Sequence, residues 1–282
     1  MVSADVAIPE WVKALPFRLG TTSYIIPAEI LPNVRYLAGH VQDVELILFE
    51  LDDGLNNLPD EDTINELRRL ADEYDLSYTI HLPLDLDLGA VGEERSKTLR
   101  KTHRAIETTR SLDAWAYVLH LDSDGLRQNS RGTRLANPNN FASAWQARAV
   151  QGLELLGEWV GSRNRLAVEN LDGYPPDFNF PVFEDTVVAQ CIDIGHLWKE
   201  GENPIDYLDM CLHRTRVIHL HGIKERDHQS LAHMPIKQID EVLNRLVTAP
   251  FKGVVTLEVF SESDLNSSLQ AIQSCLSRLA YL

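Results

Sequence analysis

The chain has 282 residues, 44% of them hydrophobic, and its 42 acidic residues outnumber its 26 basic ones, giving a formal net charge of -16. This length suits one large domain or two ordinary ones, and the acidic balance argues against broad nucleic-acid binding, which usually needs a basic surface. No apolar run approaches the roughly 20 residues that span a bilayer, and the first residues lack the pattern of a signal peptide. The 3 widely spaced cysteines form no CxxC pair, so we expect a cytoplasmic protein that does not bind membranes.

Short apolar segments alternate with longer segments of helical periodicity along the chain. The expected strands are 17–24, 43–50, 76–84, 115–122, 164–173, 185–196, 215–222 and 253–260. The expected helices are 27–40, 60–75, 93–112, 141–161, 203–212, 235–249 and 264–282. Apolar strands followed by helices indicate a parallel sheet covered on both faces, and this number of units predicts a (β/α)8 TIM barrel. The runner-up, a doubly wound open sheet, lacks a GxGxxG turn. We therefore expect one α/β domain over residues 1–282, with 1–15 as an N-terminal extension.

Ionisable side chains gather at the ends of the expected strands, where such barrels place their active sites. They are Glu50, His81, His120, Glu169, Asp193 with His196, His219 with His221, and Glu258. Each has an ordinary explanation on its own, such as a hydrogen-bonded core histidine or, for Asp193, a helix cap. Together they would repel one another and be poorly solvated unless cations neutralised them. Histidine and carboxylate ligands suit Zn, Mn, Fe or Co, so the pattern favours a metal site.

The strand ends resemble those of the xylose isomerase-like TIM barrels, the superfamily of sugar isomerases and abasic-site endonucleases. The resemblance rests on seven motifs in chain order: "YTIHLPL" (His81), "VLHLD" (His120), "AVENLDG" (Glu169), "CIDIGH", "VIHLHG" (His219), "DHQSL" and "TLEVF" (Glu258). In the endonuclease branch it implies up to three metals. One would be bound by His81, His120 and Glu169, a second by Glu169, Asp193, His219 and Glu258, and a third by His196, His228 and Asp227.

The isomerase and epimerase branches usually keep only the second of these metals, so the additional histidines favour the hydrolytic branch with two or three divalent ions. Glu169 or Glu258 would then orient the attacking water. One departure concerns the third metal: the endonuclease pattern separates its aspartate and histidine by one residue, whereas Asp227 and His228 are adjacent here. His221 also lies where the endonucleases place no ligand, and it either binds metal or acts on the substrate.

A narrower resemblance covers residues 20–50, "GTTSYIIPAEILPNVRYLAGHVQDVELILFE", which look like the opening of the cobamide-remodelling phosphodiesterases. That branch hydrolyses the phosphodiester in the nucleotide loop of a cobamide. The main rival function is a single-metal sugar isomerase or epimerase, and a third alternative is a non-catalytic binding protein. The sequence does not indicate the oligomeric state.

Two loops on the expected catalytic face carry residues that suit a substrate with a phosphate and a large planar group. The loop after the fourth strand contains Arg127, Arg131 and Arg134, which can clamp a phosphate, although a solvated loop is an equal alternative. The loop 171–183 is rich in aromatic residues, among them Tyr174, and with Trp198 can cover a planar ligand or simply pack against the core. Glu50, at the second strand end, is also expected to contact the substrate.

Overall fold

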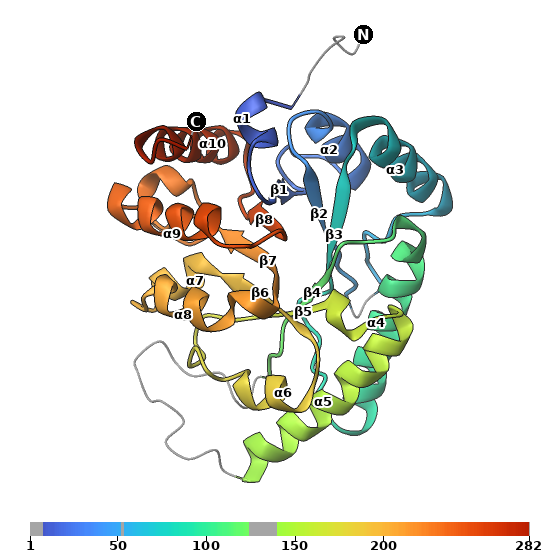
Figure 1. Cartoon of the computed structure of the whole chain (residues 1–282). Helices are drawn as coiled ribbons and strands as arrows, with labels where there is room; N and C mark the ends of the chain where they lie inside the picture. Colours follow the sequence, from blue (N-terminus) through green and yellow to red (C-terminus); the bar gives the residue numbers. More distant parts are fainter. Residues whose placement is uncertain (1–7, 52–53, 124–139, 282) are drawn as a thin grey trace.

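The computed structural model describes residues 8–51, 54–123 and 140–281, and the strands of this part form a closed parallel barrel (Figure 1). Each strand pairs with the next along the chain, and β1 closes the barrel by pairing with β8. The strands are β1 (Arg18–Thr22), β2 (Asp43–Ile47), β3 (Ser77–His81), β4 (Tyr117–Leu119), β5 (Leu166–Glu169), β6 (Ala189–Asp193), β7 (Thr215–Leu220) and β8 (Val254–Leu257). The predicted (β/α)8 barrel is confirmed, and the open-sheet alternative is wrong.

Helices surround the barrel in Figure 1. They are α1 (Glu10–Lys13), α2 (Ile30–Leu37), α3 (Glu61–Tyr74), α4 (Gly92–Thr109), α5 (Asn140–Trp159), α6 (Phe180–Asp185), α7 (Ile194–Lys199), α8 (Pro204–Cys211), α9 (Ile236–Thr248) and α10 (Glu262–Arg278). Short 3-10 turns are η1 (Arg110–Leu112), η2 (Arg163–Arg165), η3 (Leu212–Arg214) and η4 (Leu231–His233). The short helix α6 was not expected, because six residues are too few to show a helical period. The equally short α7 was expected only as the helix that Asp193 could cap.

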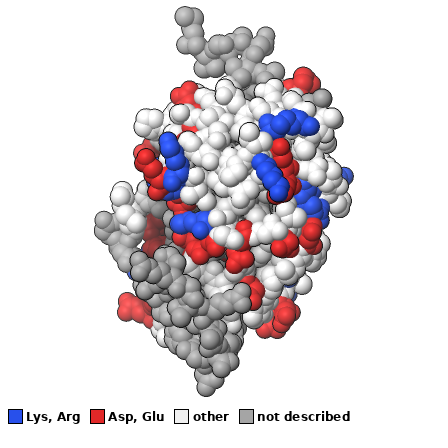
Figure 2. Space-filling view, turned by 90° about the vertical axis from the view of Figure 1, so that its left-hand side faces the viewer, with Lys and Arg blue, Asp and Glu red and all other residues white. Residues whose placement is uncertain are grey.

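The longer helices form for reasons that the sequence shows. In α9, the buried residues Ile239, Val242, Leu243 and Leu246 follow the i, i+3, i+4, i+7 spacing of one helix face. The helix α3 begins after Asp60, whose side chain accepts a hydrogen bond from the backbone N–H of Thr63. On the face covered by α9 and α10, acidic and basic side chains are interspersed (Figure 2), and Arg278 pairs there with Asp240. Within the described residues, no helix is both long enough and apolar enough to cross a membrane.

Alternation along the strands divides the side chains between two apolar clusters. The large cluster lies between the barrel and its helices, whereas a small cluster fills the barrel interior with Ala116, Val118, Ala167, Ala189, Cys191 and Val217. The three cysteines are buried and free. Because Val217 points inwards, His219, two residues later on β7, points inwards as well. The same alternation directs polar side chains from several strands into the barrel interior near the C-terminal ends of the strands.

Asp43 in β2 is a buried carboxylate whose ionisation opposes folding. Its Oδ2 accepts a hydrogen bond from Ser77 Oγ at 2.6 Å, and its Oδ1 has no hydrogen-bond partner among the described residues. Burial, only partly offset by that bond, raises the pKa of Asp43 to about 7. A folded pKa above the unfolded one means that the contribution to stability is fully present below the ordinary aspartate pKa of 3.8 and is lost as pH rises through about 7.

The variant Asp43→Asn should therefore gain stability relative to the wild type as pH rises. Its free energy of unfolding, relative to that of the wild type, should increase by about 1–3 kcal/mol between pH 5 and pH 8, because the amide cannot ionise. Urea unfolding of both proteins at the two pH values measures this quantity. An equal difference at both pH values would show that Asp43 does not titrate in this range.

Candidate metal centre

Six strands bring imidazoles and carboxylates together at their C-terminal ends. His81, Glu169 and Asp193 are the last residues of β3, β5 and β6, and His120 and Glu258 directly follow β4 and β8. His219 lies one residue before the end of β7. Nearly all of these side chains are buried; His120 is the most exposed, at 17%. The ligand atoms of these six residues form two groups, each compact enough to hold one cation, and His196, His221 and His228 form a third. Cys191 also lies within reach of Glu169 and His219.

The first group consists of His81, His120 and Glu169. Both imidazoles direct Nε2 at the same carboxylate oxygen, Glu169 Oε2, from 3.3 Å for His81 and 3.2 Å for His120. His81 Nδ1 lies 2.8 Å from the carbonyl oxygen of Leu82. Because that carbonyl can only accept, Nδ1 carries the proton of the neutral ring, and in that form Nε2 keeps the lone pair that a metal ligand requires.

The second group consists of Glu169, Asp193, His219 and Glu258, all of them buried. His219 Nδ1 lies 3.3 Å from Glu258 Oε2, 3.5 Å from Glu169 Oε1 and 3.8 Å from Asp193 Oδ2. Glu169 therefore presents Oε2 to the first group and Oε1 to the second. A carboxylate in this position bridges the two groups.

Two residues that support these groups were missed in the sequence. Glu45 lies inside the barrel on β2, and its Oε2 is 3.0 Å from His219 Nε2, which leaves Nδ1 for the second group. Asn170 joins the ends of β5 and β6: its amide donates to the carbonyl oxygen of Asp193 and accepts from the Asp193 N–H. The alternation along β2 marks Glu45 as lying on the same face as Asp43 and was the signal that could have found it.

The third group consists of His196, His221 and His228. Ring centroids are 5.7 Å apart for His196 and His221, 5.6 Å for His196 and His228, and 4.2 Å for His221 and His228. The backbone N–H of His228 lies 3.0 Å from His221 Nδ1 and points at it. His221 Nδ1 is also 3.3 Å from the carbonyl oxygen of Gly222. A cation on His221 Nε2 requires the tautomer in which Nδ1 donates to Gly222, and in that tautomer Nδ1 no longer accepts from the His228 backbone N–H.

Asp227 does not join His196 and His228. Its Oδ2 lies 2.6 Å from Lys199 Nζ, which also contacts Asp172 at 2.7 Å. Burial raises the pKa of Asp227, but the Lys199 ammonium outweighs it and holds that pKa below its usual value. His228 adopts a left-handed backbone, φ 53, in the turn that follows, so adjacent side chains diverge. The structure thus places His221 where the sequence suggested Asp227.

Several buried polar atoms in the centre make no hydrogen bond with any described residue, although some of them lie within ion-pair distance of one another. They are Glu45 Oε1, Asp193 Oδ2, His219 Nδ1, His221 Nε2, His228 Nδ1 and Glu258 Oε2. A buried polar atom without a partner costs about 1–3 kcal/mol. Bound cations would provide partners for most of these atoms at once, so the residues present fit a metal centre.

The buried carboxylates of the centre are ionised, so they need positive charge close to them. Burial raises the pKa of Glu169 and Glu258, but nearby histidines outweigh it and hold both values well below normal. Burial lowers the pKa of His228, yet Glu258 and other carboxylates raise it overall to about 9. Without a metal, protons on the histidines therefore balance the carboxylates. Metal binding has to displace these protons.

Asp193 combines two functions. Its Oδ1 caps α7 by accepting from the N–H of His196 at 2.6 Å, as the cap interpretation of "CIDIGH" requires. Its Oδ2 makes no hydrogen bond among the described residues and faces His219 in the second group. One carboxylate therefore both begins a helix and contributes to the centre.

Gly195 is the one residue of "CIDIGH" whose missing side chain matters, because a Cβ there would lie 2.0 Å from Cε1 of His221. Gly195→Ala should push the His221 ring out of the third group. We expect a loss of about 1–3 kcal/mol in the free energy of unfolding, together with fewer metal ions per chain than in the wild type. Chemical unfolding and elemental analysis measure the two effects; unchanged values for both would mean that the ring position is not constrained.

The residues that the sequence suggested as substrate contacts lie in several different places and not in one group. Glu50 lies beyond the end of β2 and pairs with Arg104 at 3.2 Å, outside the three groups. Tyr174 is buried and packs against Phe178, with ring centroids 4.5 Å apart. Trp198 is half-buried and lines a cavity of about 190 Å³ beside α8 and α9. Arg127, Arg131 and Arg134 lie outside the described residues.

Comparisons with known proteins agree with the barrel fold. A family model described as "Xylose isomerase-like TIM barrel" matches residues 41–279. No curated protein gives a sequence match. The fold is similar to a D-tagatose 3-epimerase-like protein, with 21% identity, 94% of this chain and 99% of that chain covered, and a TM-score of 0.73. It is also similar to endonuclease IV from Thermus thermophilus, with 18% identity, coverage of 93% and 99%, and a TM-score of 0.66.

A third similar structure is the TTHB071 protein, also from Thermus thermophilus, soaked with ZnCl2, with 22% identity, coverage of 94% and 99%, and a TM-score of 0.63. At such identities the likeness shows the fold alone. Epimerase-like and endonuclease chains share this barrel, so the fold does not choose between the two chemistries.

Proposed function

The chain belongs to the xylose isomerase-like TIM barrel family, and from that premise we propose that it is a metal-dependent phosphodiesterase that hydrolyses the nucleotide-loop phosphodiester of cobamides. The observation that carries the hydrolytic part is the number of ligand groups. A single-metal isomerase needs only the group of Glu169, Asp193, His219 and Glu258, whereas this chain adds two further groups beside it.

Each group has its own residues for holding a divalent ion. His81 and His120 would hold the first with Glu169, the four residues of the second group would hold another, and His196, His221 and His228 would hold the third. Zinc, manganese, iron or cobalt suits these ligands. When bound, such ions act as Lewis acids on phosphoryl oxygens and activate water at neutral pH.

The chain's own side chains then position the reaction. Glu45 fixes the His219 ring, and the backbone of Leu82 fixes the His81 ring, so neither needs to reorient when substrate binds. Glu258 lies 3.3 Å from His219 Nδ1 and 3.1 Å from His228 Nδ1, and its low pKa keeps it ionised at neutral pH. We assign Glu258, together with Glu169, to orienting the attacking water. His221 is assigned to the third ion and not to the substrate.

Room for a bulky substrate supports the cobamide assignment. A cavity of about 830 Å³ lies at the C-terminal ends of β1 and β8, lined by residues 24–28 and 260–263. Residues 24–28 belong to the stretch that resembles the cobamide-remodelling branch. Phe260 of the same cavity contacts His228, with ring centroids 5.7 Å apart. A large ligand in this cavity would therefore reach the third group.

The test is incubation of the metal-loaded protein with adenosylcobalamin, followed by mass analysis of the products. We expect release of a ribosyl phosphate fragment or its nucleoside, which shows cleavage in the nucleotide loop. An intact cobamide would refute the substrate. Cleavage of a simple diester such as bis(4-nitrophenyl) phosphate in the same preparation would still support the hydrolytic class.

A sugar isomerase or epimerase is the second candidate, and one observation favours it. The second group alone is buried and sufficient for a single metal, and two of its four members are the glutamates Glu169 and Glu258. In that case the metal-loaded protein should convert a ketose such as D-fructose or D-tagatose and leave phosphodiesters intact. Running both substrates side by side separates the two functions.

A further inference from the structure

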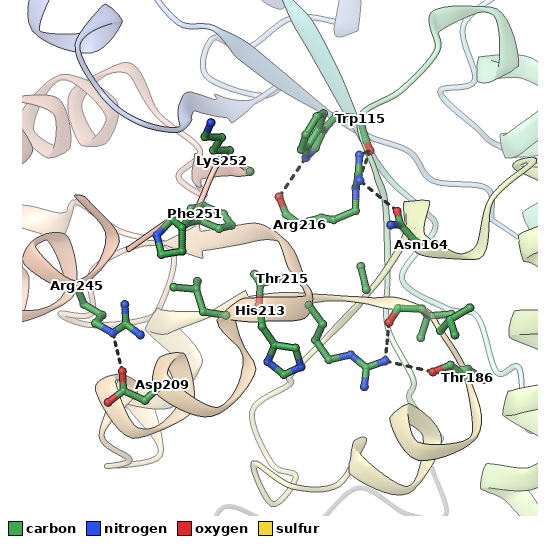
Figure 3. Close-up of a pocket in the computed structure, with 17 residues that line it drawn as sticks. Trp115, Asn164, Thr186, Asp209, His213, Thr215, Arg216, Arg245, Phe251 and Lys252 are labelled. Atoms are coloured by element: carbon green, nitrogen blue, oxygen red, sulfur yellow. Dashed lines mark hydrogen bonds and ion pairs between the residues drawn. The ribbon is translucent and has the colours of Figure 1, made fainter. Parts of the chain in front are cut away.

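The opposite end of the barrel contains a second cavity, of about 970 Å³ (Figure 3). Its walls come from residues just before or at the N-terminal ends of β4 to β8, together with Asp209 of α8 and Arg245 of α9. None of the three ligand groups contributes a residue to it. The cavity is therefore separate from the centre described above.

The lining of this cavity is basic, although the chain as a whole is acidic. Four cationic side chains line it, Arg214, Arg216, Arg245 and Lys252, against one carboxylate, Asp209. Asp209 is already paired with Arg245, at 2.6 Å. Within the described ranges, no carboxylate forms an ion pair with the other three cations. The cavity thus has an excess of three positive charges (four minus one).

Neutral acceptors hold the first of these arginines. Arg214 donates to the backbone oxygens of Phe183, Thr186 and Val188, at 3.1, 3.3 and 2.7 Å. Its guanidinium also lies 4.6 Å from the ring centroid of Phe183. Since a guanidinium has five N–H groups and three are used, two remain for a ligand.

Arg216 is held in the same way, as Figure 3 shows. Its Nε and Nη2 donate to the backbone oxygen of Trp115 at 3.1 and 2.6 Å, and its Nη1 donates to Asn164 Oδ1 at 3.2 Å. The guanidinium lies 4.1 Å from the indole ring centroid. Two of its five N–H groups also remain. Both arginines are thus fixed before any ligand arrives, which reduces the entropy cost of binding.

We propose that this cavity binds a small phosphorylated molecule. Three cations without carboxylate partners attract a dianion more strongly than a monocarboxylate, and guanidinium N–H groups match phosphate oxygens in geometry. Burial lowers the pKa of both Arg214 and Arg216, because desolvation disfavours their charge, and a bound phosphate would offset that cost. The volume is large enough for a ligand the size of a sugar phosphate.

Inorganic phosphate is the probe, titrated into the metal-loaded wild-type protein and followed by calorimetry. Lys252 is exposed, so substituting it should not disturb folding. Lys252→Gln should weaken phosphate binding by about threefold or more, and Lys252→Glu by more than about tenfold, because the second change also adds a repelling charge. The double variant Asp209→Asn/Arg245→Gln is the matched control, because it removes an existing ion pair and leaves the excess of three positive charges unchanged. It should change the dissociation constant by less than about twofold.

Phosphate can also bind at the metal centre, and Glu169→Gln separates the two sites. This variant alters the metal centre and leaves the second cavity intact. It should therefore keep the phosphate binding that Lys252→Glu weakens. Four results would overturn the proposal. One is wild-type binding in Lys252→Glu, another is loss of all binding in Glu169→Gln, and the third is no binding to the wild-type protein up to about 10 mM phosphate. The fourth is an equal loss in the Asp209→Asn/Arg245→Gln double variant and in Lys252→Gln, which would show that the charge of Lys252 does not contribute to binding.

Discussion

Replacing Glu169 by glutamine should remove metal from the first two groups at once and abolish turnover. This carboxylate is buried, and its two oxygens face different histidines: Oε2 faces His81 and His120, and Oε1 faces His219. The amide keeps the size of the side chain but has no negative charge and only one oxygen. We expect metal affinity and activity to fall by at least about 100-fold. Mutating a residue that only supports a metal ligand typically costs about 10–100-fold in metal affinity or activity, and replacing a proposed ligand should cost at least as much.

Elemental analysis and the hydrolysis assay measure these two effects, and Glu50→Gln is the control. Glu50 is also a glutamate near a strand end, but it pairs with Arg104 outside the ligand groups. Its variant should keep the wild-type metal content. If Glu169→Gln kept its metals and its activity, Glu169 would not be the bridging ligand.

The third ligand group predicts the second large effect. His196→Ala should remove one metal ion per chain and reduce hydrolysis by about 100-fold or more, while the first two groups stay loaded. Asp227→Asn should leave the metal count unchanged, because Lys199 and not the histidine group holds that carboxylate. The endonuclease pattern makes the opposite prediction for Asp227.

Metal content of Asp227→Asn and of His221→Asn, measured side by side, decides between these ligand sets. A metal ion lost from Asp227→Asn and kept in His221→Asn would restore the endonuclease set and refute the histidine triad. Full metal content in His196→Ala would mean that the third group is a network of protonated histidines and carboxylates.

The barrel and most of the strand-end residues of the centre could be predicted from local patterns in the sequence, whereas the division of these residues into groups came from the family resemblance. Apolar strands alternating with amphipathic helices leave few other folds. A polar residue at the end of a buried strand is conspicuous, as His81, Glu169 and Asp193 were. The closed barrel then brings such ends together regardless of their separation along the chain.

What could not be predicted depends on residues whose neighbours are set by tertiary structure. Glu45 lies within a strand, so an inspection of strand ends selected Glu50 instead, three residues beyond the end of β2. Asp227 and His228 lie in a turn, where strand alternation does not apply and a left-handed residue redirects the side chains. The contact between His221 and Gly195 joins two strand ends and leaves no trace in either motif alone.

The metal content of the purified wild-type chain tests the central claim most directly. Elemental analysis against protein concentration should give two or three divalent ions per chain, with the number falling by one in His196→Ala. A single ion per chain, unchanged in His196→Ala, would contradict a multi-metal phosphodiesterase and would favour the isomerase chemistry of the second group.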